Sequence, residues 1–227
     1  MMKKLTLALI VCLLTATVVS ADPSVHLTRV LGYYSGNGGE FLMTPDAEFT
    51  SLTGETGPYS SFCLEKNEYV VPGTWYDVAV ATEALFGGTK TGTPGPQGGD
   101  PLDPMTAYLY TQFRAGTLAG YNYTPGSGRS ASAKALQEVI WYIEEEGAKT
   151  WTDGDTSLQN QFYAGAVQAG WDHIGNVRVL NMYATGHLGQ AGYYKQDQLT
   201  IVPVPGAALL GSLGLGVAGW LRRRMAA

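Results

Sequence analysis

The stretch ASAKALQEVIWYIEEE, residues 131–146, contains the clearest helical pattern of the chain. Its apolar residues recur at the spacing i, i+3, i+4, i+7 and so share one helix face: they are Leu136, Val139, Ile140 and Ile143. Ser130 or Ser132 can cap the beginning of this helix, and Gly147 can end it. The pattern therefore predicts a helix over residues 131–146 that turns one apolar face to a core.

Strand patterns lie on both sides of this helix. Apolar and β-branched residues predict strands at 41–43, 74–80, 177–182 and 198–202. Further helices are predicted at 105–115 and 157–169, and loops at 121–129 and over the Gly-, Pro- and Thr-rich stretch 87–104, which we expect to be exposed. Strands at both ends with helices between them predict a mainly β fold, a sandwich or barrel, with an inserted helical part.

The first 21 residues have the three parts of a secretory signal peptide. Lys3 and Lys4 supply the positive start, an apolar run follows, and Val19-Ser20-Ala21 provides compact residues for cleavage. We therefore expect the mature chain to begin at Asp22 and to work outside the cytoplasm.

The last 26 residues have the pattern of a membrane anchor. Residues 207–221 carry no charge and are rich in Leu, Gly and Ala, and a cluster of three arginines follows them: Arg222, Arg223 and Arg224. The apolar run is short for a transmembrane helix, which needs about 20 residues, but arginines at its end can reach the interface. A buried C-terminal helix is the alternative. The arginines predict a transmembrane helix with its C-terminus in the cytoplasm.

A proline-rich signature precedes this apolar run: Val202, Pro203, Val204 and Pro205. Together with the apolar run and the arginines, residues 202–224 resemble the PEP-CTERM sorting tail of Gram-negative bacteria, although Val-Pro-Val-Pro replaces the Pro-Glu-Pro signature. The resemblance implies an exosortase-type transpeptidase as partner. It also implies export through the inner membrane, anchoring towards the periplasm, and a final place at the cell surface or in a biofilm matrix rich in exopolysaccharide.

Charge and composition limit what the body, residues 22–201, can do. Of the 14 Lys and Arg residues five lie in the two end segments, so nine face 19 acidic residues in the body, a net charge of −10. This balance argues against nucleic acid as a partner, because phosphate binding needs a surplus of basic side chains. The three histidines show no metal-ligand spacing, so we expect no metal and no cofactor.

After signal removal Cys63 is the one cysteine left. A single thiol in an exported protein has three explanations: a buried apolar residue, an intermolecular disulfide, or a thiol used in another covalent bond.

Three short motifs bear on the third explanation. They are Phe62-Cys63-Leu64-Glu65, Gln137 with Ile140 and Trp141 in the predicted helix, and Gln198 with Ile201 and Val202 in the last strand. In this order they resemble the thioester domain of bacterial surface adhesins. Two positions depart from that pattern, since Leu136 stands where the family has threonine and Asp197 where it has an apolar residue.

The resemblance implies an internal thioester between Cys63 and Gln198, with Gln137 orienting the site or donating a hydrogen bond. Water must be kept from a thioester, and aromatic cover such as Trp141 or Phe62 would serve. It implies adhesion by covalent capture of an amine on a surface protein or polysaccharide, in a single turnover, so the domain would not be a true enzyme. Tyr69 and Tyr108 are candidate supporting residues. The alternative is a structural protein of the envelope or biofilm matrix without covalent chemistry.

Overall fold

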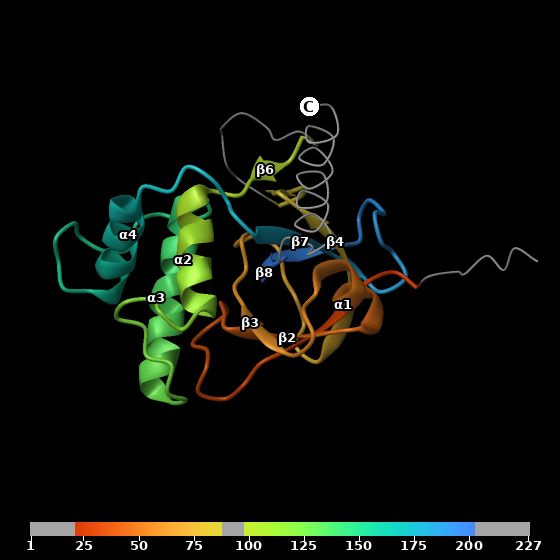
Figure 1. The fold of residues 1–227 in the computed structure, drawn as a ribbon, viewed down its shortest axis with the longest axis horizontal. Coiled ribbons are helices and arrows are strands. Elements are labelled where there is room, and N and C mark those ends of the chain that lie inside the picture. The colour runs from red at the N-terminus through yellow and green to blue at the C-terminus, as the bar shows by residue number, and fades with distance from the viewer. Residues whose placement is uncertain (1–20, 88–97, 203–227) are drawn as a thin grey trace, which may run out of the picture.

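A computed structural model of the protein describes residues 21–87 and 98–202. One antiparallel sheet of six strands curls beside a group of helices (Figure 1). Its spatial order is β3-β2-β1-β4-β7-β8. The strands are β1 (Ser24–Thr28), β2 (Phe41–Pro45), β3 (Tyr59–Ser61), β4 (Thr74–Ala81), β7 (Val177–Ala184) and β8 (Tyr194–Ile201). β5 (Glu83–Ala84) and β6 (Asp100–Pro101) form a second, two-stranded sheet.

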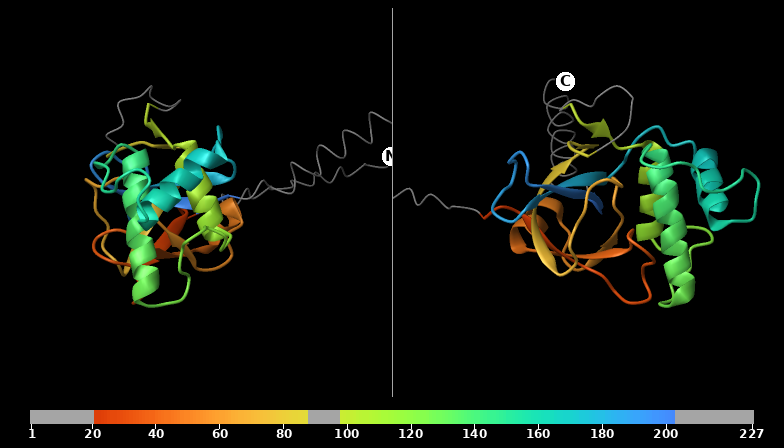
Figure 2. Two further views of the ribbon diagram at one scale, coloured as in Figure 1. Left: turned by 90° about the vertical axis from the view of Figure 1, so that its left-hand side faces the viewer. Right: turned by 180° about the vertical axis from the view of Figure 1, so that it is seen from behind.

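Four helices accompany the sheet: α1 (Ala47–Thr53), α2 (Pro104–Arg114), α3 (Ser127–Ile143) and α4 (Leu158–Ala169). The last three follow one another in the chain between β6 and β7 and lie together at one side of the sheet (Figures 1 and 2). The prediction of a mainly β fold with an inserted helical part is therefore confirmed.

Local sequence signals explain where most helices begin. The side chains of Asp46, Asp103 and Ser157 accept hydrogen bonds from backbone N–H groups in the first turns of α1, α2 and α4, which satisfies donors that a helix start leaves free. Pro104 suits the first turn of α2 because that position needs no N–H.

α3 departs from its predicted limits at both ends. It begins at Ser127, so residues 127–129 of the predicted loop are helical and the predicted serine caps lie inside the helix. A contact from another part of the chain accounts for the extension, because Arg129 in the first turn binds Glu40 through Nε and Nη2. The helix ends at Ile143, not at Gly147.

One strand prediction and one loop prediction also need correction. β8 begins at Tyr194 rather than Gln198, because it pairs with β7 in a hairpin that the polar residues 195–198 do not reveal by hydropathy. In the stretch predicted as an exposed loop, β6 pairs with β5 and Leu102 is buried. Residues 88–97 of that stretch lie outside the described part of the chain.

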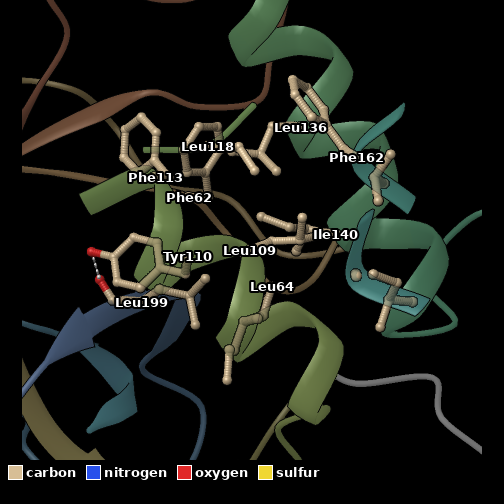
Figure 3. Close-up of a cluster of buried hydrophobic side chains, with 14 of the residues drawn as sticks. Phe62, Leu64, Leu109, Tyr110, Phe113, Leu118, Leu136, Ile140, Phe162 and Leu199 are labelled. Carbon is tan, nitrogen blue, oxygen red and sulfur yellow. Dashed lines mark hydrogen bonds between the residues drawn. The ribbon is translucent and has the colours of Figure 1, made fainter. Parts of the chain in front are cut away.

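Two clusters of buried side chains form the core. The inner core packs against the concave sheet and includes Val25, Leu27, Phe41, Met43, Phe49, Tyr59, Cys63, Tyr76, Val78, Leu180 and Met182. The helix-side core lies between α2, α3, α4 and the sheet. Figure 3 shows part of this second cluster, in which the Tyr110 hydroxyl lies 3.0 Å from the Leu199 carbonyl oxygen.

Residues 1–20 of the predicted signal peptide and most of the predicted sorting tail, including Pro203 and the arginine cluster, lie outside the described residues. Among the helices that the structure does describe, none combines the length and apolar character needed to cross a bilayer.

Candidate functional site

The two ends of the curled sheet meet at a seam. We define the seam as residues 61–65, which begin at the last residue of β3, together with residues 196–199 of β8. Two backbone hydrogen bonds join the segments, from Leu199 N to Phe62 O at 3.2 Å and from Leu64 N to Asp197 O at 3.1 Å. The Ser61 hydroxyl adds a third link, donating to Leu199 O at 2.7 Å. The seam therefore holds two segments in register that are more than a hundred residues apart in sequence.

Cys63 and Gln198 lie directly opposite each other in this seam. The two backbone bonds flank the pair, so it is of the non-hydrogen-bonded kind, in which Cα atoms approach to about 4.5 Å and side chains are closest. Opposite residues of an antiparallel pair project to the same face of the sheet. The fold thus brings the thiol-bearing and carboxamide-bearing residues, predicted as partners, side by side.

Gln198 carries a polar group that the described structure leaves unsatisfied. The residue is fully buried, and neither Oε1 nor Nε2 has a hydrogen-bond partner. Burying an unpaired amide costs roughly 1–3 kcal/mol in proteins. Its backbone is held on both sides, by Leu180 of β7 and by Cys63, so the carboxamide cannot easily turn to water.

Gln137 contacts Cys63 in a different way. Its Oε1 accepts hydrogen bonds from Gly39 N at 3.0 Å, Cys63 N at 3.2 Å and Cys63 Sγ at 3.1 Å. Its Nε2 donates to Cys63 O at 2.8 Å. The Gln137 carboxamide therefore clamps the backbone of Cys63 and contacts its thiol.

The Cys63 thiol is fully buried and protonated at neutral pH. Burial raises its pKa far above the ordinary value, and the nearby Glu65 carboxylate raises it further. Interactions with Arg29 and Trp141 act in the opposite direction but are weaker. A reaction at this sulfur consequently needs a group that takes up the thiol proton.

Trp141 covers the site from the surface of α3. It packs against the inner core that contains Cys63, and its buried Nε1 has no hydrogen-bond partner. The Lys66 ammonium lies over its ring, 5.7 Å from the centroid. A surface pocket of about 550 Å³ reaches this cover and Gln137. Cys63 itself does not line the pocket, whereas Gln137 both lines it and accepts a hydrogen bond from the Cys63 thiol.

Two glycines complete the clamp and were missed as functional residues. A Cβ at Gly38 would come within 2.4 Å of Gln137 Cγ, and one at Gly39 within 2.9 Å of Ser61 O and Phe62 Cδ1. Only glycine lets this loop approach closely enough for Gly39 N to reach Gln137. The sequence signal for them is the run 36–39, in which three of four residues are glycine.

The departure at Asp197 from the third motif has a physical explanation. Its side chain is buried, and burial together with Glu65 raises its pKa well above the ordinary value. The surroundings of Asp197 therefore favour its neutral acid form at this apolar position. Leu136, the departure in the second motif, is fully buried in the helix-side core and packs as an apolar residue.

The supporting tyrosines are placed unequally. Tyr69 lines the pocket near Trp141, although 74 % of it is exposed. Tyr108 packs edge-on against Trp171 in the helix-side cluster and belongs to no part of the seam. Within residues 21–87 and 98–202, no group of His, Cys, Asp or Glu side chains is arranged to hold a metal ion.

Comparison with protein-family models, with curated proteins and with solved structures finds no match for this chain. The functional argument accordingly depends on the geometry of the seam.

Proposed function

We propose that the body of this protein forms an internal thioester between Cys63 and Gln198 and uses it to capture an amine-bearing ligand covalently. The observation that carries the proposal is the Gln198 carboxamide, fully buried, unpaired and directly opposite the buried thiol. Losing its nitrogen as ammonia removes two unsatisfied N–H donors from the core. The thioester is thus the state in which this site has fewer unsatisfied polar groups.

The reaction balances without an added reagent. The Cys63 sulfur attacks the Gln198 carboxamide carbon, the S–C bond forms, the C–N bond breaks, and the thiol proton leaves with the nitrogen as ammonia. The seam supplies proximity, which is worth several kcal/mol of barrier when reacting atoms are held at attack distance. Burial then protects the thioester from water.

Gln198 is a better acyl partner than Gln137. The Gln137 carboxamide makes four hydrogen bonds to Gly39 and Cys63, and losing its nitrogen would break the bond to Cys63 O. Reaction at Gln198 costs its own carboxamide no hydrogen bond, and only the bond from the Cys63 thiol to Gln137 Oε1 is lost. The two glutamines therefore take the roles of clamp and reactant.

Capture of the ligand is the reverse of thioester formation, with a ligand amine in the place of ammonia. A ligand amine that enters by the pocket and displaces Trp141 attacks the thioester carbon. The Cys63 thiol leaves, and an amide bond remains between ligand and residue 198. The event happens once for each molecule, which suits adhesion at a surface. The proposed signal peptide and sorting tail would deliver the domain there through an exosortase-type partner.

The test is the intact mass of the full-length exported protein, purified in detergent, beside its Cys63→Ala variant with the same ends. We expect the wild type to lack one ammonia relative to the mass computed from the variant, and to regain mass as a methylamide at residue 198 after methylamine treatment. A wild type with its full mass and an alkylatable Cys63 would contradict the proposal and favour the structural envelope protein.

A further inference from the structure

Two buried carboxyl groups flank the proposed thioester. Glu65 follows Cys63 by two residues and Asp197 precedes Gln198, and they are 1 % and 3 % exposed. Glu65 Oε2 accepts a hydrogen bond from Asp197 N at 2.8 Å, and Asp197 Oδ1 accepts one from Met182 N at 2.9 Å. The second oxygen of each, Glu65 Oε1 and Asp197 Oδ2, is buried without a partner.

Burial and neighbouring acids favour the acid form of both groups. The pKa of Glu65 is raised well above its ordinary value by burial and by Glu68 and Glu146, and that of Asp197 by burial and by Glu65. In the described part of the chain neither carboxyl forms an ion pair. The seam therefore favours protonated carboxyl groups beside a thiol and a carboxamide.

We propose that Glu65 moves the proton in thioester formation, with Asp197 as its positioning partner. This inference rests on the proposed function. The Glu65 carboxyl gives its proton to the departing Gln198 nitrogen and then takes the Cys63 thiol proton as the S–C bond forms and the C–N bond breaks. Glu65 ends unchanged, and ammonia is the one product released.

The position of Glu65 singles it out for this role. It lies two residues from Cys63, its Oε2 accepts a hydrogen bond from the backbone N–H of the residue before Gln198, and it also raises the pKa of the Cys63 thiol. The side chains that contact or cover the thiol, Gln137 and Trp141, have no acidic proton to transfer near neutral pH. An amide nitrogen leaves slowly unless it is protonated, so a positioned acid has a large effect.

The experiment measures the rate of ammonia loss in full-length chains made by cell-free synthesis with membrane vesicles, sampled over time by intact mass. Glu65→Gln keeps the shape but removes the transferable proton. We expect it to slow the loss by about 100-fold or more, the usual effect of removing a general acid or base. Glu68→Gln is the matched control: it removes a half-buried carboxyl outside the seam that acts only by raising the pKa of Glu65, so the rate at pH values below that pKa should stay unchanged.

The pH dependence separates proton transfer from a structural role. The wild-type rate should fall as pH rises through the raised pKa of Glu65. Asp197→Asn should move this fall to lower pH, because it removes an acid neighbour and supplies an amide donor that favours the Glu65 carboxylate. Glu146, Glu68 and the Lys195 near it also face this region, and none of them changes in the Asp197 variant.

The outcomes are distinct. Ammonia loss from Glu65→Gln at the wild-type rate, or an Asp197→Asn profile that does not move, would overturn the role of Glu65 while leaving the thioester intact. A wild type that never loses ammonia would instead overturn the thioester itself. Should Glu65→Gln fail to fold, as circular dichroism would show, the Asp197 profile decides.

Discussion

Cys63 is reached from two regions of the molecule, the face of α3 and the edge strand β8, and each contributes one buried glutamine. Gln137 on α3 makes every hydrogen bond that its carboxamide oxygen can accept and holds the Cys63 backbone. Gln198 on β8 makes none through its side chain. Two glutamine side chains that are equally buried thus differ: the carboxamide on the helix has its hydrogen-bond partners, and the carboxamide on the strand has none. The difference indicates that the helix positions the thiol while the strand supplies the atom that reacts.

The largest expected effect is on thioester formation, which should depend on the two glutamines in different ways. Gln198→Ala should abolish both the ammonia loss and the methylamine addition completely, because no acyl carbon remains opposite Cys63. Gln137→Ala keeps that carbon and should still lose ammonia, but more slowly because the thiol is no longer oriented. Intact mass of both variants after equal times distinguishes them. Complete loss in Gln137→Ala with normal conversion in Gln198→Ala would exchange the two roles.

A second effect separates them by stability, with opposite signs. In a Cys63→Ala background, where no thioester can form, Gln137→Met leaves Gly39 N and both backbone groups of residue 63 unpaired. We expect a loss of about 2–5 kcal/mol in the free energy of unfolding. Gln198→Met removes an unsatisfied amide of similar shape and should add about 1–3 kcal/mol.

Urea denaturation of the background and the two variants checks these signs. A destabilising Gln198→Met would mean that this carboxamide finds a partner in solution, and would weaken the contrast on which the proposed function depends.

The sequence could predict the strand side of this contrast better than the helix side. Cys63 and Gln198 fall in short motifs, and the alternation of a strand places each on one face. The predicted helix also placed Gln137 and Trp141 one turn apart. Chain order and residue type were sufficient for these four residues because three lie in regular elements and Cys63 lies in an isolated bridge just after β3.

The remaining parts of the site depend on contacts between distant segments. Gly39 reaches Gln137 across 98 residues, and Glu65 meets Asp197 across 132. Neither contact has a local periodicity, so no window of the sequence could reveal it. The early start of α3 has the same origin, since its first turn is fixed by the bond between Arg129 and Glu40 across 89 residues.

A third prediction concerns pH and the strand side alone. The pKa values of Glu65 and Asp197 are raised in the folded protein. At pH values above the ordinary carboxyl pKa of about 4, the folded chain therefore binds more protons at these two groups than the unfolded chain does. The stabilisation is complete below that value and is lost as pH rises towards the folded pKa values. In the Cys63→Ala background we expect up to about 1.4 kcal/mol lost per pH unit for each carboxyl.

Urea denaturation at several pH values measures this slope. The double variant Glu65→Gln, Asp197→Asn should flatten it, whereas Gln137→Met should only shift the curve downward. An unchanged slope in the double variant would show that other groups, such as Glu68, carry the pH dependence.

A fourth prediction concerns the cover on the helix side. Trp141→Ala opens the base of the pocket to water, so the thioester should hydrolyse faster. We expect about tenfold, which corresponds to roughly 1.4 kcal/mol of barrier. Trp141→Phe retains most of the apolar cover and serves as the control. Mass spectrometry follows hydrolysis as the gain of one water after the thioester has formed.

The smallest expected effect tests the seam itself. The Ser61 hydroxyl donates to Leu199 O at 2.7 Å and accepts from Leu199 N at 3.0 Å, so Ser61→Ala should lower stability by about 1 kcal/mol. The proposed thioester joins the same two segments one pair further along, and it would hold the seam together without the hydroxyl. The destabilisation should therefore be smaller in the thioester form than in the Cys63→Ala background, and equal losses in both would mean that no covalent bond crosses the seam.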